Sequence, residues 1–194
     1  EITDHVKAGE ANGIVVEVTN EAMEDVIPLS GDFPLFGGLH RSVHLITTES
    51  VCITPLDYAS PGVYIRQRDV SSSSGTVDVT TKLSNGRTDA VEATVYVTIR
   101  GAGGTEVATA ETQVQARPGT TPTMATLSIA NPSLWNGRTS PYLYSVTTTV
   151  SLEGRVVDEV VQPLGLRTYR FDKNTGFYLN GQHLKIHGVA RHQD

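Results

Sequence analysis

The sequence predicts an all-β protein, and two observations carry this prediction. Valine and threonine dominate a chain that is poor in leucine, methionine and aromatic residues, and both pack well on a pleated surface. From Val63 onward, apolar and polar residues alternate in short runs, with turn signals about every 8–12 residues, as is typical of β-sandwiches. A length of 194 residues fits one large domain or two small ones.

Residues 1–53 are expected to be the end of a larger β domain. Strands are predicted at 14–18 and 42–46, separated by a loop rich in proline and glycine from Pro28 to Gly38. The segment contains nine acidic and two basic residues, whereas the rest of the chain is nearly balanced. So few strands cannot bury a core alone, and the charge changes near their end. We therefore predict a domain boundary between residues 54 and 55.

Residues 55–166 are expected to form a complete immunoglobulin-like sandwich. The chain lacks the Cys…Trp…Cys framework of antibody domains, so the sandwich would be of the fibronectin type. Strands are predicted at 63–70, 76–84, 91–100, 105–114, 122–129, 142–152 and 155–163.

Trp135, the only tryptophan, follows Leu134 in a turn-rich segment. Two interpretations remain open: the pair closes one end of the sandwich, or the indole is exposed and stacks on a sugar. Tyr142 and Tyr144 alternate into the next strand, and one of them is expected to bond to backbone, as in a tyrosine corner.

A β-hairpin is predicted near the C-terminal end. Phe177–Leu179 and His183–Ile186 flank Asn180-Gly181, the dipeptide best suited to a type I′ turn. The second arm leads to the polar group Arg191-His192-Gln193-Asp194. Polar residues directly after an apolar strand indicate the rim of a binding site.

The composition argues against several classes of function. No window of about 18 apolar residues is present to span a membrane, and no basic stripe with interleaved aromatic residues indicates nucleic acid. The single cysteine, Cys52, cannot form an intrachain disulfide and is expected to be an inert thiol in a strand. No metal-binding motif, phosphate-binding loop or Ser-His-Asp motif stands out. We therefore expect no metal or other cofactor.

Three segments together resemble glycoside hydrolase family 2, the β-galactosidases and β-glucuronidases. GDFPLFGGLHRSVHL (31–45) is similar to the segment that closes the family's N-terminal sugar-binding jelly roll. NPSLWNGRTSPYLYSV (131–146) is similar to the Asn-Pro-x-Leu-Trp…Pro-Tyr-Leu-Tyr run of the family's immunoglobulin-like domain. The segment from Gly165 onward resembles the start of the (β/α)₈ barrel, where an Asn-Gly hairpin precedes Gly-Val-x-Arg-His.

This resemblance implies three parts of a longer protein. Residues 1–54 would be the C-terminal part of the jelly roll, 55–166 the sandwich, and 167–194 the hairpin with the first barrel strand. The complete protein would hydrolyse terminal β-linked sugars with retention, as a β-galactosidase in the first place and a β-glucuronidase in the second. Its partners would be carbohydrate and the remaining jelly-roll and barrel domains of the same polypeptide.

The resemblance also implies that the catalytic groups lie outside these 194 residues. A retaining glycosidase needs two carboxylates about 5–5.5 Å apart, and in the family both are glutamates on later barrel strands. No glutamate of this chain matches them, so we expect no activity from it alone. The acid pairs Glu24-Asp25 and Asp158-Glu159 are interpreted as solvated loop or strand residues.

Three residues match positions where the family contacts sugar or shapes the sugar pocket. Asp32 matches a loop aspartate that reaches from the jelly roll into the pocket, and an ionised carboxylate accepts strong hydrogen bonds from hydroxyls. His192 matches a pocket histidine at the C-terminal end of the first barrel strand, the face that carries barrel active sites. Arg191 is expected to brace the same rim through a carboxylate. Without the resemblance, Asp32 is interpreted as a turn residue, and His192 is equally a pocket residue or a polar residue at a frayed end.

Two interpretations compete with the glycosidase. One is a carbohydrate-binding or adhesion module without chemistry, in which Trp135 would be exposed; the other is a purely structural spacer. Export to the periplasm or cell exterior is expected for a polysaccharide-degrading enzyme, although Glu1-Ile2-Thr3-Asp4 does not resemble a signal peptide.

Overall fold

The computed structural model describes residues 1–21, 24, 37–39 and 41–190. It divides the chain into two compact units, Thr47–Ile186 and a second made of Glu1–Ile46 with His187–Asp194. Every strand of the described residues belongs to the first unit.

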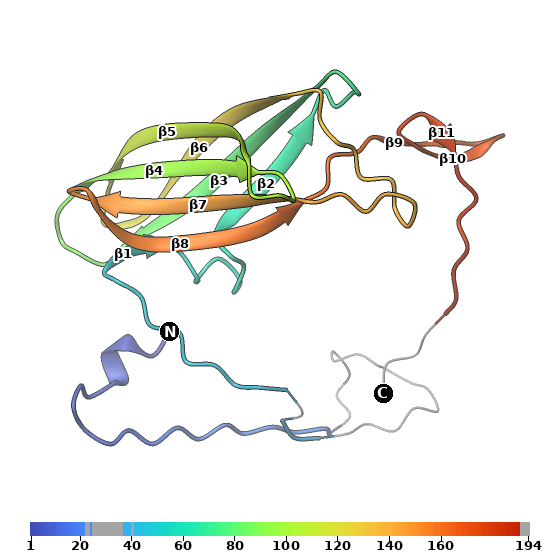
Figure 1. The fold of residues 1–194 in the computed structure, drawn as a ribbon. Coiled ribbons are helices and arrows are strands. Elements are labelled where there is room, and N and C mark those ends of the chain that lie inside the picture. The colour runs from blue at the N-terminus through green and yellow to red at the C-terminus, as the bar shows by residue number, and fades with distance from the viewer. Residues whose placement is uncertain (22–23, 25–36, 40, 191–194) are drawn as a thin grey trace. The chain divides into compact units, whose positions relative to one another are not determined.

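Residues Thr47–Ile186 form an antiparallel β-sandwich with a small third sheet (Figure 1). The strands are β1 (Val51–Ile53), β2 (Val63–Arg68), β3 (Ser74–Asn85), β4 (Val91–Arg100), β5 (Glu106–Ala116), β6 (Gly119–Ala130), β7 (Tyr144–Leu152), β8 (Arg155–Leu164), β9 (Tyr169–Asp172), β10 (Gly176–Leu179) and β11 (Gln182–His183). In the first sheet β6 pairs with the whole of β3, and β1 and β2 follow one another along its other edge. The second sheet has the order β5-β4-β7-β8, and the third β11-β10-β9.

The core lies between the two larger sheets and consists mainly of β-branched residues. On β4, Val95, Val97 and Ile99 are at most 2% exposed, while the residues between them face outward. The same alternation runs the length of β3. Strict alternation over ten or more residues therefore buries one face of each strand and leaves the other polar.

All seven strands predicted between residues 63 and 163 form, as β2 to β8, with ends shifted by at most three residues. The boundary between the compact units, however, lies earlier than our predicted domain boundary. Cys52 and its neighbours form β1, which pairs with Leu83, Ser84 and Asn85 of β3 and therefore belongs to the sandwich.

The segment between β1 and β2 contains Pro55 and Pro61. In the structure it is a loop held against the first sheet. The Lys82 ammonium lies 2.8 Å from the Asp57 carboxylate, and the Tyr64 hydroxyl donates to the same carboxylate. Thr54 donates its backbone N–H to the Lys82 carbonyl. The loop is thus part of the sandwich domain, as the predicted span 55–166 has it.

The two strands predicted at 14–18 and 42–46 do not form. The only regular element described in this unit is a single helical turn, η1 (Thr3–His5). Val15 is 95% exposed, and the described residues of this unit offer it no partner strand. A strand needs a neighbouring strand to pair its backbone N–H and C=O groups. The alternation of apolar and polar residues was therefore not enough to form a strand here. No helix in the described part of the chain is long and apolar enough to cross a membrane.

Both tyrosines before and at the start of β7 bond to backbone, where we expected one. The Tyr144 hydroxyl, on a side chain that is buried, accepts a hydrogen bond from the Ser133 N–H at 2.8 Å. The Tyr142 hydroxyl accepts one from Ala102 N–H at 3.1 Å. The two rings pack edge to face with centroids 5.0 Å apart. Together they tie the loops before β5 and before β7 to the end of the sandwich.

Candidate functional site

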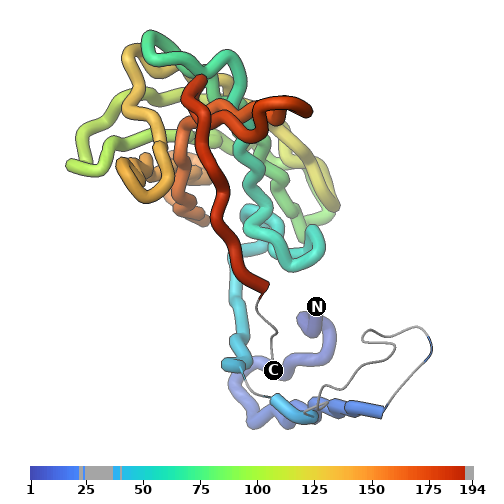
Figure 2. Tube along the Cα trace, turned by 90° about the vertical axis from the view of Figure 1, so that its right-hand side faces the viewer, coloured from blue at the N-terminus to red at the C-terminus, as the bar shows by residue number. Residues whose placement is uncertain are grey.

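The three sugar-binding residues predicted from the resemblance, Asp32, Arg191 and His192, lie outside the described residues. What the structure describes is the small third sheet from which the chain continues toward Arg191. After β11 the chain continues through Ile186 without a further helix or strand (Figure 2). Lys185 and Ile186 are exposed.

The third sheet is a three-stranded meander, built on two turns. Asn180 and Gly181 both have positive φ, 48° and 79°, as a type I′ turn requires, and they join β10 to β11 as predicted. At the other turn, the Asp172 carboxylate accepts hydrogen bonds from the backbone N–H groups of Asn174 and Thr175, both at 2.9 Å. Local sequence therefore accounts for both reversals of the chain.

Asn180 also fastens this sheet to the sandwich. Its side-chain amide donates to the Trp135 carbonyl at 3.0 Å and to the Asn136 side-chain oxygen at 2.6 Å. Its own side-chain oxygen accepts from Thr168 N–H at 2.8 Å, and its backbone N–H donates to the Thr168 carbonyl at 2.9 Å. The sequence predicts only the turn for Asn180, because its partner Trp135 is distant in sequence and no local pattern reveals the pairing.

Trp135 lies at this joint and is half-buried. Its backbone N–H donates to the Leu166 carbonyl at 2.8 Å, and the Arg167 guanidinium covers its ring at 5.1 Å from the centroid. A Cβ added to Gly165 would lie 3.1 Å from the Trp135 Cβ, so the backbone passes close to this side chain. Leu134 packs against the core. These contacts agree with the interpretation that the pair closes one end of the sandwich.

Three of the described aspartates, Asp57, Asp78 and Asp172, are held in hydrogen bonds within the fold. Hydrogen bonds hold their pKa values low: from Lys82 and Tyr64 at Asp57, from Arg68 and Thr126 at Asp78, and from the Thr175 side chain and neighbouring backbone at Asp172. A glycosidase's general acid needs the opposite shift, so that it carries a proton near neutral pH. These three carboxylates are therefore unsuited to that role.

Asp158 departs from the solvated role that we expected for it. It is only partly exposed, and its carboxylate accepts a hydrogen bond from the buried Ile53 N–H at 2.8 Å. This bond links the edge strands β8 and β1 of the two facing sheets. Glu159 is exposed, as predicted.

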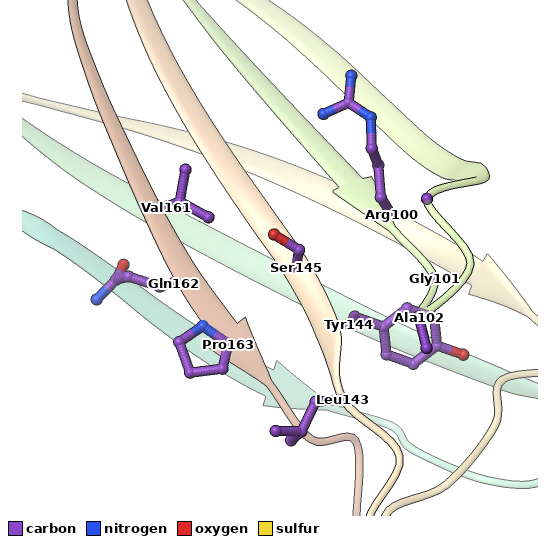
Figure 3. Close-up of a pocket in the computed structure, with 10 residues that line it drawn as sticks. Arg100, Gly101, Ala102, Leu143, Tyr144, Ser145, Val161, Gln162 and Pro163 are labelled. Atoms are coloured by element: carbon purple, nitrogen blue, oxygen red, sulfur yellow. The ribbon is translucent and has the colours of Figure 1, made fainter.

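A shallow depression lies where β4 ends, β7 begins and β8 ends (Figure 3). Arg100, Tyr144 and Gln162 are among its lining residues, and none of the residues described there carries a carboxylate. The Tyr144 hydroxyl is occupied by Ser133, and Arg100 lies 3.8 Å from Glu106. This surface offers no acid and base pair for glycoside hydrolysis.

The described residues provide neither a metal-binding site nor a reactive thiol. They contain no group of three or more histidine, cysteine or acidic side chains able to hold a metal ion. Burial raises the pKa of the Cys52 thiol, which keeps it protonated and unreactive.

Comparison with known proteins decides the family. The sequence model of the family described as glycosyl hydrolases family 2 matches residues 61–167, which is more than half of the chain. The chain belongs to this family. The match spans β2 to β8 and the loop that carries Trp135, so it covers the sandwich described above except for β1.

The relatives of this chain are much longer than the chain itself. A beta-glucuronidase from Bacteroides fragilis is 45% identical over all of this chain and 28% of its own length. The beta-galactosidase BoGH2A from Bacteroides ovatus is 30% identical over all of the chain and 22% of its own length. A solved structure from Bacteroides fragilis, assigned provisionally to the beta-galactosidases, is 44% identical with a TM-score of 0.88, covering 91% of this chain and 27% of that one. The chain thus spans about a quarter of the length of these relatives.

Proposed function

We propose that the chain is the non-catalytic part of a retaining exo-β-glycosidase, and that the complete protein removes terminal β-linked sugars. The observation that carries this is the full-length match of the chain to glucuronidases and galactosidases of the family. The role of the chain is to hold the third sheet at a fixed place on the sandwich. In the complete protein, Asp32, Arg191 and His192 would contribute to the sugar pocket, as the family resemblance implies.

A β-glucuronide is the first candidate substrate and a β-galactoside the second. The beta-glucuronidase at 45% identity supports the first. BoGH2A at 30% identity supports the second, as does the solved structure at 44% identity. This order reverses our expectation from the sequence, because that expectation rested on motifs that both branches share.

The complete polypeptide is the right test object. We expect it to hydrolyse 4-nitrophenyl β-D-glucuronide with a higher kcat/KM than 4-nitrophenyl β-D-galactoside, and we expect the 194-residue chain to hydrolyse neither. The reverse preference would support the galactosidase. Turnover of neither substrate by the complete polypeptide, or of either by the 194-residue chain, would contradict the proposal.

Substitution tests the assigned sugar contacts. Asp32→Ala in the complete polypeptide should lower kcat/KM about 10- to 100-fold, because a hydrogen bond to a charged group contributes about 1.5–3 kcal/mol. His192→Ala should lower it about 2- to 10-fold, because a hydrogen bond between neutral groups contributes about 0.5–1.5 kcal/mol. Asp89→Ala, an exposed loop residue of the sandwich, is the matched control and should leave kcat/KM unchanged. Equal activity of all three variants would remove Asp32 and His192 from the pocket.

The competing carbohydrate-binding module makes a different prediction. If Trp135 binds glycan, the 194-residue chain should retain sugar binding that Trp135→Ala abolishes. The Arg167 guanidinium over the indole supports the structural role instead, because it occupies a face that a sugar would use.

A further inference from the structure

Four asparagines of the chain are followed directly by glycine, at positions 12, 85, 136 and 180. This dipeptide favours intramolecular deamidation, because glycine has no Cβ to keep its backbone nitrogen away from the asparagine side chain. The glycine nitrogen attacks Cγ of the asparagine and forms a cyclic imide, and the side-chain nitrogen leaves as ammonia with the proton of the glycine N–H. Water then opens the imide at either carbonyl, which yields aspartate or isoaspartate. The fold decides which of the four sites reacts.

The leaving nitrogen is held by the fold at three of these sites. The side-chain nitrogens of Asn12, Asn85 and Asn180 each donate two hydrogen bonds. At Asn85 the acceptors are the carbonyls of Asp89 and Ala116, at 2.9 and 2.8 Å. A nitrogen held in this way leaves only after both bonds are broken, and each broken bond lowers the population of the reactive form.

Asn136 is the exception. Its side-chain oxygen accepts a hydrogen bond from the Asn180 amide at 2.6 Å, but its side-chain nitrogen donates none to the described residues. The attacking Gly137 N–H is equally unbonded within the described part of the chain. By contrast, the Gly86 N–H donates to the Ser50 carbonyl at 2.7 Å. The nucleophile and the leaving group are therefore both available at residues 136 and 137, whereas both are occupied at residues 85 and 86.

The backbone around Asn136 forms a turn at the surface. The Asn136 N–H donates to the Ser140 carbonyl, and the Asn136 carbonyl accepts from the Thr139 hydroxyl, both at 2.8 Å. Gly137 has a φ of 60°. Asn136 is half-buried, and the residues from Arg138 to Ser140 are exposed. Water therefore has access to this turn without unfolding of the sandwich.

We propose that Asn136 deamidates in the folded protein and that this reaction changes the joint between the sandwich and the third sheet. In the aspartate product, residue 136 keeps the oxygen that bonds to Asn180 and gains a negative charge, which strengthens the bond. The Arg167 guanidinium, 5.1 Å from the centroid of the adjoining Trp135 ring, brings a positive charge to the same joint.

The isoaspartate product has the opposite effect on the joint. Its main chain passes through the side-chain carbon and is longer by one methylene. The bond to the Ser140 carbonyl and the bond from Asn180 then no longer fit the same backbone. The aspartate form therefore preserves the joint, and the isoaspartate form weakens it.

The chain contains its own matched control for this reaction. Asn85 and Asn136 are each followed by Gly-Arg-Thr, so the fold, rather than the sequence after the asparagine, distinguishes them. The 194-residue chain is suitable because the joint lies within one compact unit, Thr47–Ile186. The folded chain is incubated at mildly alkaline pH beside the same chain unfolded in urea. Peptide mapping by mass spectrometry then measures deamidation at each asparagine over time.

We expect the two asparagines to react at comparable rates in urea. In the folded chain, Asn136 should react at least about tenfold faster than Asn85, because breaking each hydrogen bond of Asn85 lowers its reactive population about two- to tenfold. Equal rates in the folded chain, or no reaction at Asn136 while the unfolded chain reacts at both sites, would overturn the proposal. Asn136→Gln should remove the fast reaction, because its longer side chain closes a six-membered ring far more slowly. A fast reaction that survives this change would also contradict the proposal.

The effect on the joint is measured separately. Asn136→Asp imitates the aspartate product and should preserve or raise the urea midpoint reported by Trp135 fluorescence. The incubated natural chain, with its isoaspartate quantified by isoaspartyl methyltransferase, should have a lower midpoint than the fresh chain. If Asn136→Asp lowers the midpoint as much as incubation does, the opposite effects assigned to the two products are wrong. None of these measurements uses glycoside turnover, so their outcome is independent of the proposed function.

Discussion

The side-chain amide of Asn180 donates a hydrogen bond of 3.0 Å to the backbone carbonyl of Trp135, 45 residues earlier in the chain. Asn180 is also the first residue of the type I′ turn, with φ of 48°. One residue therefore reverses the chain and fixes the reversed chain to the sandwich. The position of the third sheet on the sandwich depends on this pair.

Asn180→Ala should destabilise the joint by about 2–3 kcal/mol. The change removes three side-chain hydrogen bonds and leaves a residue with a Cβ, but without a compensating polar group, in the left-handed region. Trp135, the only tryptophan, lies at the joint, so its fluorescence during urea unfolding of the 194-residue chain reports the loss. Asn174→Ala, in the other turn of the same sheet, is the control. An unchanged midpoint for Asn180→Ala would show that the joint does not depend on this side chain.

Asp158→Ala should lower the free energy of unfolding by about 1–3 kcal/mol, because the buried Ile53 N–H loses its acceptor. Asp158→Asn keeps a side-chain oxygen and should recover most of the loss. Denaturant unfolding measures both variants, with Glu159→Gln at the exposed neighbouring position as the control. If Asp158→Asn is as unstable as Asp158→Ala, the carboxylate contributes through its charge rather than as an acceptor for Ile53.

Acid should weaken the sandwich through Asp57 and Asp78. Bonding to Lys82 and to Arg68 lowers the pKa of these carboxyls below the ordinary 3.8 in the folded state. Their contribution is therefore present above pH 3.8 and is lost as the pH falls through the lower folded values. Both groups lie at the surface, so the effect should be modest and should shrink at high salt.

The double variant Asp57→Asn, Asp78→Asn tests this dependence. Its stability should fall less steeply than that of the natural chain below about pH 4, as followed by thermal unfolding at a series of pH values. Asp89→Asn, in an exposed loop, is the control. Parallel pH profiles for the natural chain and the double variant would rule out these two carboxylates as the acid-sensitive groups.

Prediction from the sequence succeeded where neighbouring residues carry the information and failed where distant partners do. Alternation located β2 to β8, because each long strand buries one of its two faces. The same alternation at 14–18 produced no strand, since pairing depends on a neighbour that alternation does not supply. β1 was assigned to the preceding domain for a related reason, because its partner Leu83 is 30 positions away from Ile53.

The sequence by itself determined the all-β class, the immunoglobulin-like sandwich, the Asn180-Gly181 turn and the family, because periodicity, turn chemistry and motif spacing are local properties. Only the tertiary structure decided which residues far apart in the sequence form hydrogen bonds with each other. It paired Asn180 with Trp135 and Asp158 with Ile53, covered the indole with Arg167, and left Tyr169 and Phe171 on an open face. These outcomes depend on which surfaces meet when the two large sheets and the small one pack, and that cannot be deduced from residues adjacent in sequence.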